Sequence, residues 1–352
     1  MTGVGGIVNV GLTCYANATI QAFRHCKGME DLCKEEKYTS MLKPNCKYNE
    51  ITKQFADIVQ NLSIMNKTSS LRPNGFWHAF SSVVKDSCFE HLASREPHDA
   101  HEFLMFLLDS LHESLSRSVT MNITTCSLKS EKQIFHQKSL ETWKANFEKQ
   151  YSPIVHSFFG MFHIQTFCGR CKNITNKWET FNTLKGVIQK GDPVSLLDSI
   201  HGELNEESIE DYVCEKCPVR VNAIRKTKIW KLPNNLIVVL KRFTHDGRKI
   251  HTPLIPFTKL CLSELFSANS PNKKHSNYTI RSIIDHHGSS HGGHYTAQAK
   301  REEGKEGGKE ESKEGGKEES KEKWYMFDDQ DIYEIDGPKM GDSSYILFLE
   351  NV

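Results

Sequence analysis

Two CxxC pairs constrain the fold of this chain more than any other feature. They are Cys168-Gly-Arg-Cys171 and Cys214-Glu-Lys-Cys217. Two such pairs supply the four thiolates of a structural zinc site, which leaves no open position for a reacting water. The segment between the pairs is longer than in compact zinc ribbons, so we expect the two knuckles at the base or tip of long hairpins. A redox role is the alternative, but a thioredoxin-like CxxC would need a βαβ context that the sequence lacks.

The cysteine count and the start of the chain indicate a reducing compartment. Eleven cysteines, an odd number, are spread through 352 residues, and the first residues lack the basic-then-apolar pattern of a secretory signal. Most of these cysteines should therefore be free thiols or metal ligands. No apolar run approaches the roughly 20 residues that span a bilayer. We expect a soluble intracellular protein, in the cytoplasm or the nucleus.

The charge balance excludes partners that are attracted by a strong overall field. The chain has 45 Lys and Arg residues against 44 Asp and Glu residues, a net charge of +1. Such a chain has no global field that favours nucleic acid or an acidic membrane surface. We expect neither as a partner, and any partner must be recognised by a local surface.

Hydrophobic patterns predict helices in the first part of the chain and strands in the rest. Apolar residues at helical spacings predict helices over residues 14–25 and 99–115. After about residue 155, short β-branched and aromatic runs alternate with turn residues, which is typical of strands. Helices followed by a sheet indicate an α+β fold. The expected strands include residues 236–240, 278–284, 324–327 and 345–349.

A charged repeat interrupts the strand-rich part of the chain. Residues 305–320 hold two copies of KEGGKEES, and the whole segment 301–323 contains no apolar residue. Such a segment cannot bury enough surface to offset the entropy cost of ordering, so we expect a disordered loop. Doubling the length of a surface loop costs only about 0.6 kcal/mol, so this insert need not disturb the fold.

Cys14 has the local surroundings of a nucleophile. It stands at or near the start of the first predicted helix, where the helix dipole favours the thiolate. Thr13 suits the cap of that helix, and Gly11 suits a turn close to the reacting atoms. The amide of Asn9 could donate to the oxyanion that forms when a thiolate adds to a carbonyl. A cysteine at a helix start is also often a small buried hydrophobic residue, so the assignment depends on partners elsewhere in the chain.

His294 is the histidine best placed to act as the base. Two glycines precede it and a strand-like segment follows, which would present the ring on a rigid strand beside a close-approach loop. Asp328 or Asp329 follows the next predicted strand and would orient the imidazole. If these two strands form a hairpin, the charged repeat is its tip, and the histidine and the aspartate lie on adjacent strands.

The same segments, in the same order, resemble the ubiquitin-specific protease family. GIVNVGLTCYANATIQ is similar to its cysteine box, REPHDAHEFLMFLLDSLH to its second characteristic helix, and HHGSSHGGHYTAQAK with WYMFDD to its histidine box. LIVVLKRF and SYILFLE are similar to family strands. The matches run from Gly6 to about Leu349, nearly the whole chain.

The resemblance implies one papain-like catalytic domain over residues 1–352. Its parts would be a helical thumb over about 1–150, zinc-bearing fingers over about 155–235 and a β-rich palm over about 236–352. The zinc would be structural. The catalytic cleft would lie between thumb and palm, and we expect a monomer that binds ubiquitin and ubiquitinated proteins.

The resemblance also implies roles for single residues. The nucleophile would be Cys14, the general base and acid His294, and the orienting carboxylate Asp328. Asn9 would stabilise the oxyanion, with Asp329 as support.

Further residues are implied to contact the substrate. Asp99 and Glu102 match positions that pair with arginines of the ubiquitin tail, and Tyr295 is a further substrate contact; residues 287–293 resemble a blocking loop. The family usually has glutamines where Pro97 and His98 stand here, which is a departure in the tail-binding segment.

The resulting hypothesis is a deubiquitinating thiol hydrolase that cuts after the C-terminal glycine of ubiquitin. The thiolate would form a thioester that water hydrolyses. Two alternatives remain open: a protease for a ubiquitin-like modifier, and an inactive ubiquitin-binding module. The intact Cys14, His294 and Asp328 argue against the inactive module. A zinc-dependent hydrolase is disfavoured because no H-E-x-x-H motif is present.

Overall fold

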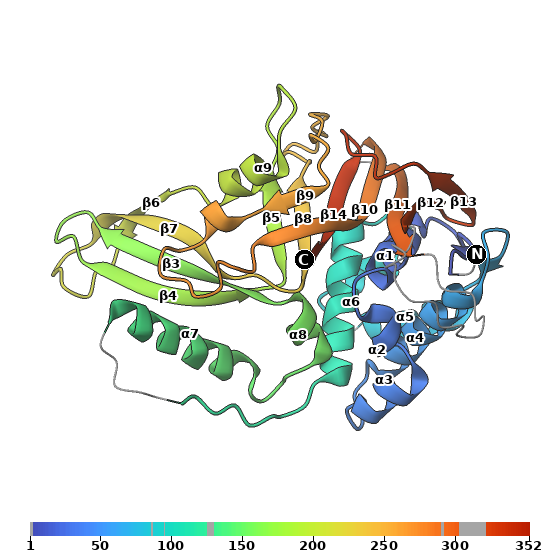
Figure 1. The fold of residues 1–352 in the computed structure, drawn as a ribbon, viewed down its shortest axis with the longest axis horizontal. Coiled ribbons are helices and arrows are strands. Elements are labelled where there is room, and N and C mark those ends of the chain that lie inside the picture. The colour runs from blue at the N-terminus through green and yellow to red at the C-terminus, as the bar shows by residue number, and fades with distance from the viewer. Residues whose placement is uncertain (1–2, 86, 95, 125–129, 290–291, 303–321) are drawn as a thin grey trace, which may run out of the picture. The chain divides into compact units, whose positions relative to one another are not determined.

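The chain folds into two compact units that both combine helices and strands (Figure 1). The structure is a computed structural model, and it describes residues 3–85, 87–94, 96–124, 130–289, 292–302 and 322–352. Unit 1 comprises Met1–Ser114 and Arg281–Phe348, and unit 2 comprises Leu115–Ile280 and Leu349–Val352. Each unit is described by itself below.

Unit 1 contains most of the helices. The two predicted ones are α1 (Cys14–Arg24) and α6 (Ala100–Leu115), so both sequence predictions are confirmed to within a residue or two. A short parallel pair, β1 (Gly6–Ile7) with β2 (Ser70–Leu71), lies beside them. The other helices of this unit are α2 (Met29–Leu32), α3 (Glu35–Met41), α4 (Asn49–Ile64), α5 (Asn74–Val84) and the 3-10 helix η1 (Glu90–Ala93).

Helix α1 lies in the interior of unit 1. Every residue from Cys14 to Arg24 is buried, although the sequence pattern had indicated only one apolar face. The helix packs against β11 (Gly292–Glu302) and β12 (Glu322–Asp328). Several of its polar side chains form hydrogen bonds inside the unit; the Arg24 guanidinium, for example, donates to the Gly3 carbonyl at 3.0 Å and to Gln21 at 2.8 Å. A rigid, fully enclosed helix therefore carries the candidate nucleophile.

Antiparallel strands form the sheet of unit 1, in the order β13-β12-β11-β10-β14. The predicted hairpin is present, because Ala297 of β11 pairs with Phe327 of β12 and the pairing continues to Glu302 with Glu322. The repeat at its tip falls within residues 303–321, which lie outside the described residues. The other strands are β10 (Asn277–Ser289), whose first residues belong to unit 2, β13 (Asp331–Ile335) and β14 (Ser344–Asn351).

Unit 2 is built on a four-stranded antiparallel sheet in the order β4-β3-β7-β6. Helix α7 (Glu131–Phe147) packs on one face of it, where Phe135 meets Met161, Trp178 and Trp230 in a buried cluster. The Trp143 ring adds to this cluster. The strands are β3 (Gly160–Cys168), β4 (Ile174–Phe181), β6 (Glu207–Tyr212) and β7 (Val221–Lys231).

A second strand pair in unit 2 is parallel. Strand β5 (Thr183–Val187) runs beside β8 (Asn235–Lys241), which contains the predicted apolar strand and is buried along almost its whole length. Helix α9 (Leu196–Glu203) packs on β5. The remaining elements are α8 (Pro153–Phe158), β9 (Lys259–Cys261) and the 3-10 helix η2 (Ser263–Leu265).

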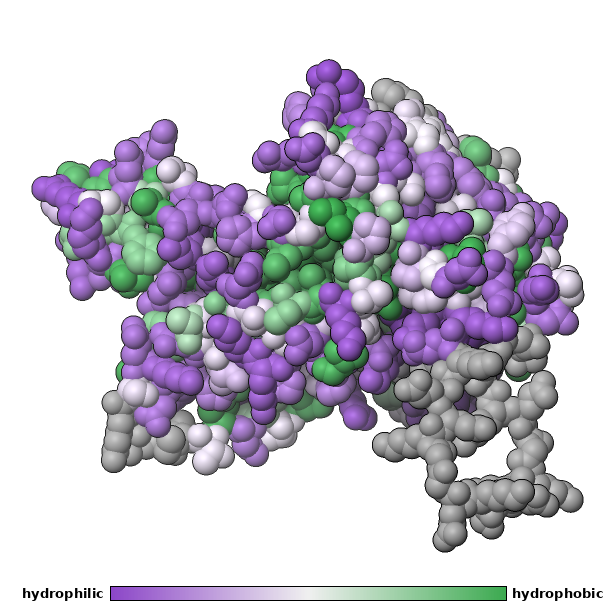
Figure 2. Space-filling model, turned by 45° about the horizontal axis from the view of Figure 1, so that its top comes forward, coloured by the Kyte–Doolittle hydropathy of each residue, from purple (hydrophilic) through white to green (hydrophobic). Residues whose placement is uncertain are grey.

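None of the described helices combines the length and the apolar character needed to cross a bilayer. In the space-filling view, hydrophilic residues cover much of the visible face, and hydrophobic residues gather in separate patches (Figure 2).

Candidate active site and cysteine cluster

Cys14 is the first residue of α1, and Asn9 shapes the loop before it. The Asn9 Oδ1 atom accepts hydrogen bonds from the backbone nitrogens of Gly11 at 3.0 Å and Thr13 at 3.1 Å. Gly11 has a φ of 118°, in the left-handed region that favours glycine. Only 8% of Cys14 is exposed. The loop therefore holds the thiol in a fixed, nearly buried position.

Thr13 does not cap α1, so that prediction is wrong. Its φ of −99° and ψ of 12° are not the extended conformation of a capping residue. The hydroxyl contacts Asn9 Oδ1 and accepts from the Val10 amide, each at 3.2 Å, instead of reaching the helix amides. Thr13 thus stabilises the preceding loop.

His294 and Asp328 lie side by side on the β11–β12 hairpin. The Nε2 atom of His294 is 2.5 Å from Oδ1 of Asp328, and the two side chains are 42% and 39% exposed. The strand register explains the contact, since it puts Asp328 opposite Thr296, two residues from His294 and on the same face. Because Nε2 is engaged by the carboxylate, Nδ1 is the ring nitrogen left to exchange a proton with a thiol.

Glycines allow the backbone to turn tightly beside His294. A Cβ atom at Gly293 would clash with the His287 carbonyl and the His286 ring. Any residue other than glycine would introduce this clash. Gly288, its partner on β10, has a φ of 115°. The predicted close-approach loop next to the base is therefore confirmed by the geometry of these two positions.

The pKa of Cys14 is raised, whereas the sequence suggested that the helix dipole would lower it. Burial is the largest cause because it penalises the thiolate, and the Asp329 carboxylate adds to the rise. Backbone hydrogen bonds from Tyr295, Tyr15 and Cys14 itself oppose these effects. The site therefore favours the neutral thiol and needs a base to form the nucleophile.

Asp329 links the end of the β11–β12 hairpin to helix α1, which carries Cys14. Its Oδ2 atom accepts from Nδ2 of Asn9 and its Oδ1 atom from Nδ2 of Asn17, both at 2.8 Å. The Ile7 amide donates to its carbonyl at 2.9 Å. Its φ of 53° is left-handed, a conformation that aspartate tolerates. Sequence reasoning missed Asn17, which is one of several polar residues in the predicted helix.

The amide nitrogen of Asn9 has two hydrogens, and one of them is used by Asp329. The predicted role at an oxyanion would therefore rest on the other. The ligand atoms of His294, Asp328 and Asp329 all lie within 4.8 Å of one another. With Cys14 and Asn9, the structure brings these residues together in unit 1.

Asp99 caps the N-terminus of α6. Its Oδ1 atom accepts from the backbone nitrogens of His101 at 2.7 Å and Glu102 at 3.3 Å, and its Oδ2 atom accepts from the Tyr345 hydroxyl at 2.8 Å. Burial raises the pKa of this carboxyl, and these hydrogen bonds oppose the rise. The contacts give Asp99 a structural role, and Tyr345 is a partner that the sequence did not suggest.

Tyr295 lies between the nucleophile and the start of α6. Its backbone hydrogen-bonds Cys14, and its ring centroid is 4.6 Å from that of His286 and 6.3 Å from that of Tyr345. Burial and the Asp99 carboxylate both raise the pKa of its hydroxyl. Glu102, in contrast, is half exposed on the first turn of α6.

The four cysteines of the CxxC pairs form one cluster in unit 2. Cys168 ends β3, Cys171 lies in the turn to β4, and Cys214 and Cys217 lie in the turn from β6 to β7. The prediction placed the two knuckles at the base or tip of long hairpins, and the structure has them at the tips. Sulfur–sulfur distances are 3.7 Å for Cys168 and Cys217 and 3.6 Å for Cys171 and Cys214, and all four sulfurs lie within 4.8 Å of one another.

The geometry of this cluster fits a tetrahedral metal ion. Zn–S bonds of about 2.3 Å place the sulfur atoms of a tetrahedral site about 3.8 Å apart, whereas a disulfide joins sulfurs at about 2.05 Å. Backbone hydrogen bonds, first from Cys171, lower the pKa of Cys168 to about 6, whereas burial raises the pKa of the neighbouring Cys217 to about 12. The sulfur distances allow the cluster to hold a metal ion through its four cysteines.

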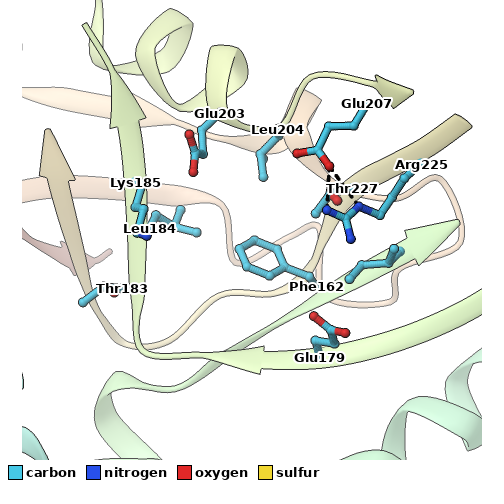
Figure 3. Close-up of a pocket in the computed structure, with 11 residues that line it drawn as sticks. Phe162, Glu179, Thr183, Leu184, Lys185, Glu203, Leu204, Glu207, Arg225 and Thr227 are labelled. Carbon is cyan, nitrogen blue, oxygen red and sulfur yellow. Dashed lines mark hydrogen bonds and ion pairs between the residues drawn. The ribbon is translucent and has the colours of Figure 1, made fainter. Parts of the chain in front are cut away.

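A separate cavity of about 290 Å³ lies in unit 2 beside the four-stranded sheet (Figure 3). The carboxylates of Glu179, Glu203 and Glu207 surround the Phe162 ring, and Glu207 is paired with Arg225 at 2.5 Å. Its lining residues include neither a cysteine nor a histidine. The cavity therefore cannot hold the predicted Cys-His site.

The chain resembles known proteins from several organisms. It is 24% identical over 361 residues to ubiquitin carboxyl-terminal hydrolase 2 of Bos taurus, covering 99% of this chain and 55% of that protein. It is 28% identical over 357 residues to ubiquitin carboxyl-terminal hydrolase 36 of Drosophila simulans, covering 98% of this chain and 31% of that protein. The chain thus spans about half or less of the length of these relatives.

Solved structures share its fold. The SAGA DUB module of Ubp8, Sgf11, Sus1 and Sgf73 bound to monoubiquitin matches with a TM-score of 0.70 and 21% identity, over 99% of this chain and 69% of that one. A yeast SAGA DUB module matches with a TM-score of 0.68, again at 21% identity and over 99% and 69% of the two chains. The family model described as ubiquitin carboxyl-terminal hydrolase matches residues 5–349. The chain therefore belongs to the ubiquitin carboxyl-terminal hydrolase family.

Proposed function

We propose that the chain is a deubiquitinating cysteine protease that cleaves the peptide or isopeptide bond after the C-terminal glycine of ubiquitin. One observation carries the proposal: Cys14 starts a buried helix and is hydrogen-bonded by the backbone of Tyr295, the residue next to a His294–Asp328 pair. Nucleophile, base and orienting carboxylate are the three parts of a thiol protease site. Family membership over residues 5–349 supports the same reaction.

The mechanism has two steps. In the first, His294 takes the Cys14 proton, the thiolate attacks the carbonyl of the terminal glycine, and His294 returns the proton to the leaving lysine amine. In the second, His294 takes a proton from water, whose oxygen attacks the thioester; the carbon–sulfur bond breaks, His294 returns the proton to the Cys14 sulfur, and the C-terminal carboxylic acid leaves and ionises. Asp328 holds the imidazole through Nε2, which directs Nδ1 to these proton transfers.

Asn9 would stabilise the oxyanion in both steps. One of its N–H groups donates to Asp329, which fixes the orientation of the side chain, and the other remains to donate to the developing negative charge. A preorganised donor is worth about 2.7–4 kcal/mol in comparable sites.

The cysteine cluster would hold a structural zinc ion through Cys168, Cys171, Cys214 and Cys217. Four thiolate ligands leave no position for a substrate, so the ion would stabilise the ends of the β3–β4 and β6–β7 hairpins. The sulfur distances and the two-pair spacing support zinc.

Substrate and cellular context are part of the proposal. The chain would act as one domain with thumb, fingers and palm, and as a monomer on ubiquitinated proteins in the cytoplasm or nucleus. Asp99, Glu102 and Tyr295 would form the side of the channel that receives the ubiquitin tail. Glu102 is the exposed carboxylate among them, while Asp99 acts mainly through the α6 cap.

The test is a reaction with ubiquitin that carries a thiol-reactive electrophile at its C-terminus. We expect a covalent adduct with the purified protein, none with the Cys14→Ala variant, and none with equivalent probes built on ubiquitin-like modifiers. Labelling only by a probe built on another modifier would support the mechanism but show that the substrate is that modifier. Binding of ubiquitin without any adduct would contradict catalysis and favour a binding module.

A further inference from the structure

Glu102 is paired with a histidine that sequence reasoning did not single out. The Nε2 atom of His91 lies 2.9 Å from Oε2 of Glu102, and the two side chains are 50% and 51% exposed. His91 belongs to η1 and Glu102 to the first turn of α6, so two separate elements bring the groups together. The contact becomes an ion pair when the imidazole is protonated.

A second histidine lies next to this pair but does not compete for the carboxylate. The His98 ring centroid is 6.4 Å from that of His91 and 5.4 Å from that of Tyr15, the residue after the nucleophile. Its Nε2 atom is 3.0 Å from the carbonyl oxygen of Ser94, to which it donates. His98 therefore stabilises the loop before α6 through this hydrogen bond, and His91 is the histidine in contact with Glu102.

We propose that His91 competes with an arginine of the ubiquitin tail for Glu102, and so raises KM. The inference rests on the proposed function, because it takes Glu102 as the carboxylate that receives the tail. A guanidinium reaches its strongest contact by bonding both carboxylate oxygens, and His91 already occupies one of them. The arginine must therefore displace the imidazole.

The exchange favours the substrate, but displacing the imidazole has a cost. Arginine is always charged and bidentate, whereas an exposed histidine makes one contact that water screens.

The first experiment measures KM and kcat for ubiquitin with a fluorogenic C-terminal amide. The His91→Ala variant should lower KM about two- to five-fold, the range of an exposed pair, with kcat unchanged. His91→Gln, which keeps a hydrogen-bond donor without a charge, should lower KM less than His91→Ala does. His275→Ala, at an exposed histidine of unit 2, should match the wild type.

A second experiment separates this inference from the proposed function. Calorimetry in the Cys14→Ala background compares the binding of normal ubiquitin with that of ubiquitin whose tail arginines are replaced by alanine. Removing His91 should tighten only the first complex. An unchanged or higher KM in His91→Ala, with ubiquitin still cleaved, would overturn the competition alone. A wild-type protein that neither binds nor cleaves ubiquitin would overturn the proposed function and this inference with it.

Discussion

Asn17 and Asp329 lie 312 positions apart in the sequence and are joined by a 2.8 Å hydrogen bond between Nδ2 and Oδ1. The other carboxylate oxygen of Asp329 binds Asn9, so one side chain connects the turn after Asp328 to both the loop and the helix of the nucleophile. The same carboxylate raises the pKa of Cys14. Asp329 therefore stabilises the arrangement of the site through hydrogen bonds, while its charge disfavours the Cys14 thiolate.

Replacing Asp329 with Asn should separate these two effects. The amide keeps an oxygen that can accept from Asn17, but it removes the negative charge that raises the pKa of Cys14. The pKa of the thiol should therefore fall, which increases the thiolate fraction at pH 7 by several-fold, since one pKa unit is a factor of ten. The measurement is the rate of alkylation by iodoacetamide as a function of pH, whose midpoint should move to lower pH.

The matched control for this experiment is Asp331→Asn. Asp331 starts β13 two residues further on, is exposed, and is not among the causes of the Cys14 shift. Its alkylation profile should equal that of the wild type. An unchanged midpoint in Asp329→Asn would mean that the carboxylate does not influence the thiol.

Gly293 should be intolerant of alanine because of the backbone beside His294. The new Cβ would meet the His287 carbonyl and the His286 ring, so the hairpin must shift and carry the imidazole with it. We expect kcat for a ubiquitin substrate to fall by at least about ten-fold, since misplacement of a catalytic group by 1 Å can cost about a hundred-fold. Gly337→Ala is the control, because a Cβ there has no atom within 4 Å. Equal activity of the two variants would argue against a close-approach role for Gly293.

Local patterns predicted the elements of the site, and long-range packing supplied the details that sequence could not. The period of apolar residues located α1 and α6, and turn residues located the β11–β12 hairpin, because both signals act over neighbouring residues. Asn17 and His91 were missed because their partners, Asp329 and Glu102, are brought to them by tertiary structure. Patterns among neighbouring residues in the sequence do not indicate such a pairing.

The pKa of Cys14 illustrates the same limit. Its position at a helix start is a local property, and the dipole argument from that position favours a thiolate. Burial and the Asp329 charge are properties of the folded unit, and together they reverse the expected direction. The capping role of Thr13 failed for a different, local reason, since Asn9 and the Val10 amide in the preceding loop engage its hydroxyl.

Asp99 should contribute to stability mainly as the cap of α6. Asp99→Ala removes the acceptor for the His101 and Glu102 amides and should lower the free energy of unfolding by about 1 kcal/mol, the usual cost of losing an N-cap. Asp99→Asn keeps an oxygen for these amides and should lose much less. Urea unfolding of the three proteins at pH 7 makes the comparison, and equal losses in both variants would contradict the capping role.

The pH dependence of stability tests the raised pKa of Asp99. Burial makes the folded protein bind this proton more tightly than the unfolded chain, whose aspartates titrate near pH 3.9. Stability should therefore fall as pH rises from about 4 through the raised pKa of the folded state. Asp99→Asn should remove this part of the fall, as measured by urea unfolding between pH 3.5 and about 7. Identical pH profiles for the variant and the wild type would exclude a raised pKa at this carboxyl.

The cysteine cluster predicts one zinc ion per chain, bound at the tips of two hairpins. Cys214→Ser removes one of four thiolates and should abolish stoichiometric zinc, whereas Cys261→Ser, at an exposed cysteine of β9 outside the cluster, should retain it. Because metal binding stabilises the loops that carry its ligands, a strong chelator should increase hydrogen exchange in the turns at residues 169–173 and 213–220. Metal analysis and exchange mass spectrometry give the two readouts. A metal-free protein that forms a disulfide between Cys168 and Cys171 under mild oxidation would instead establish a redox pair.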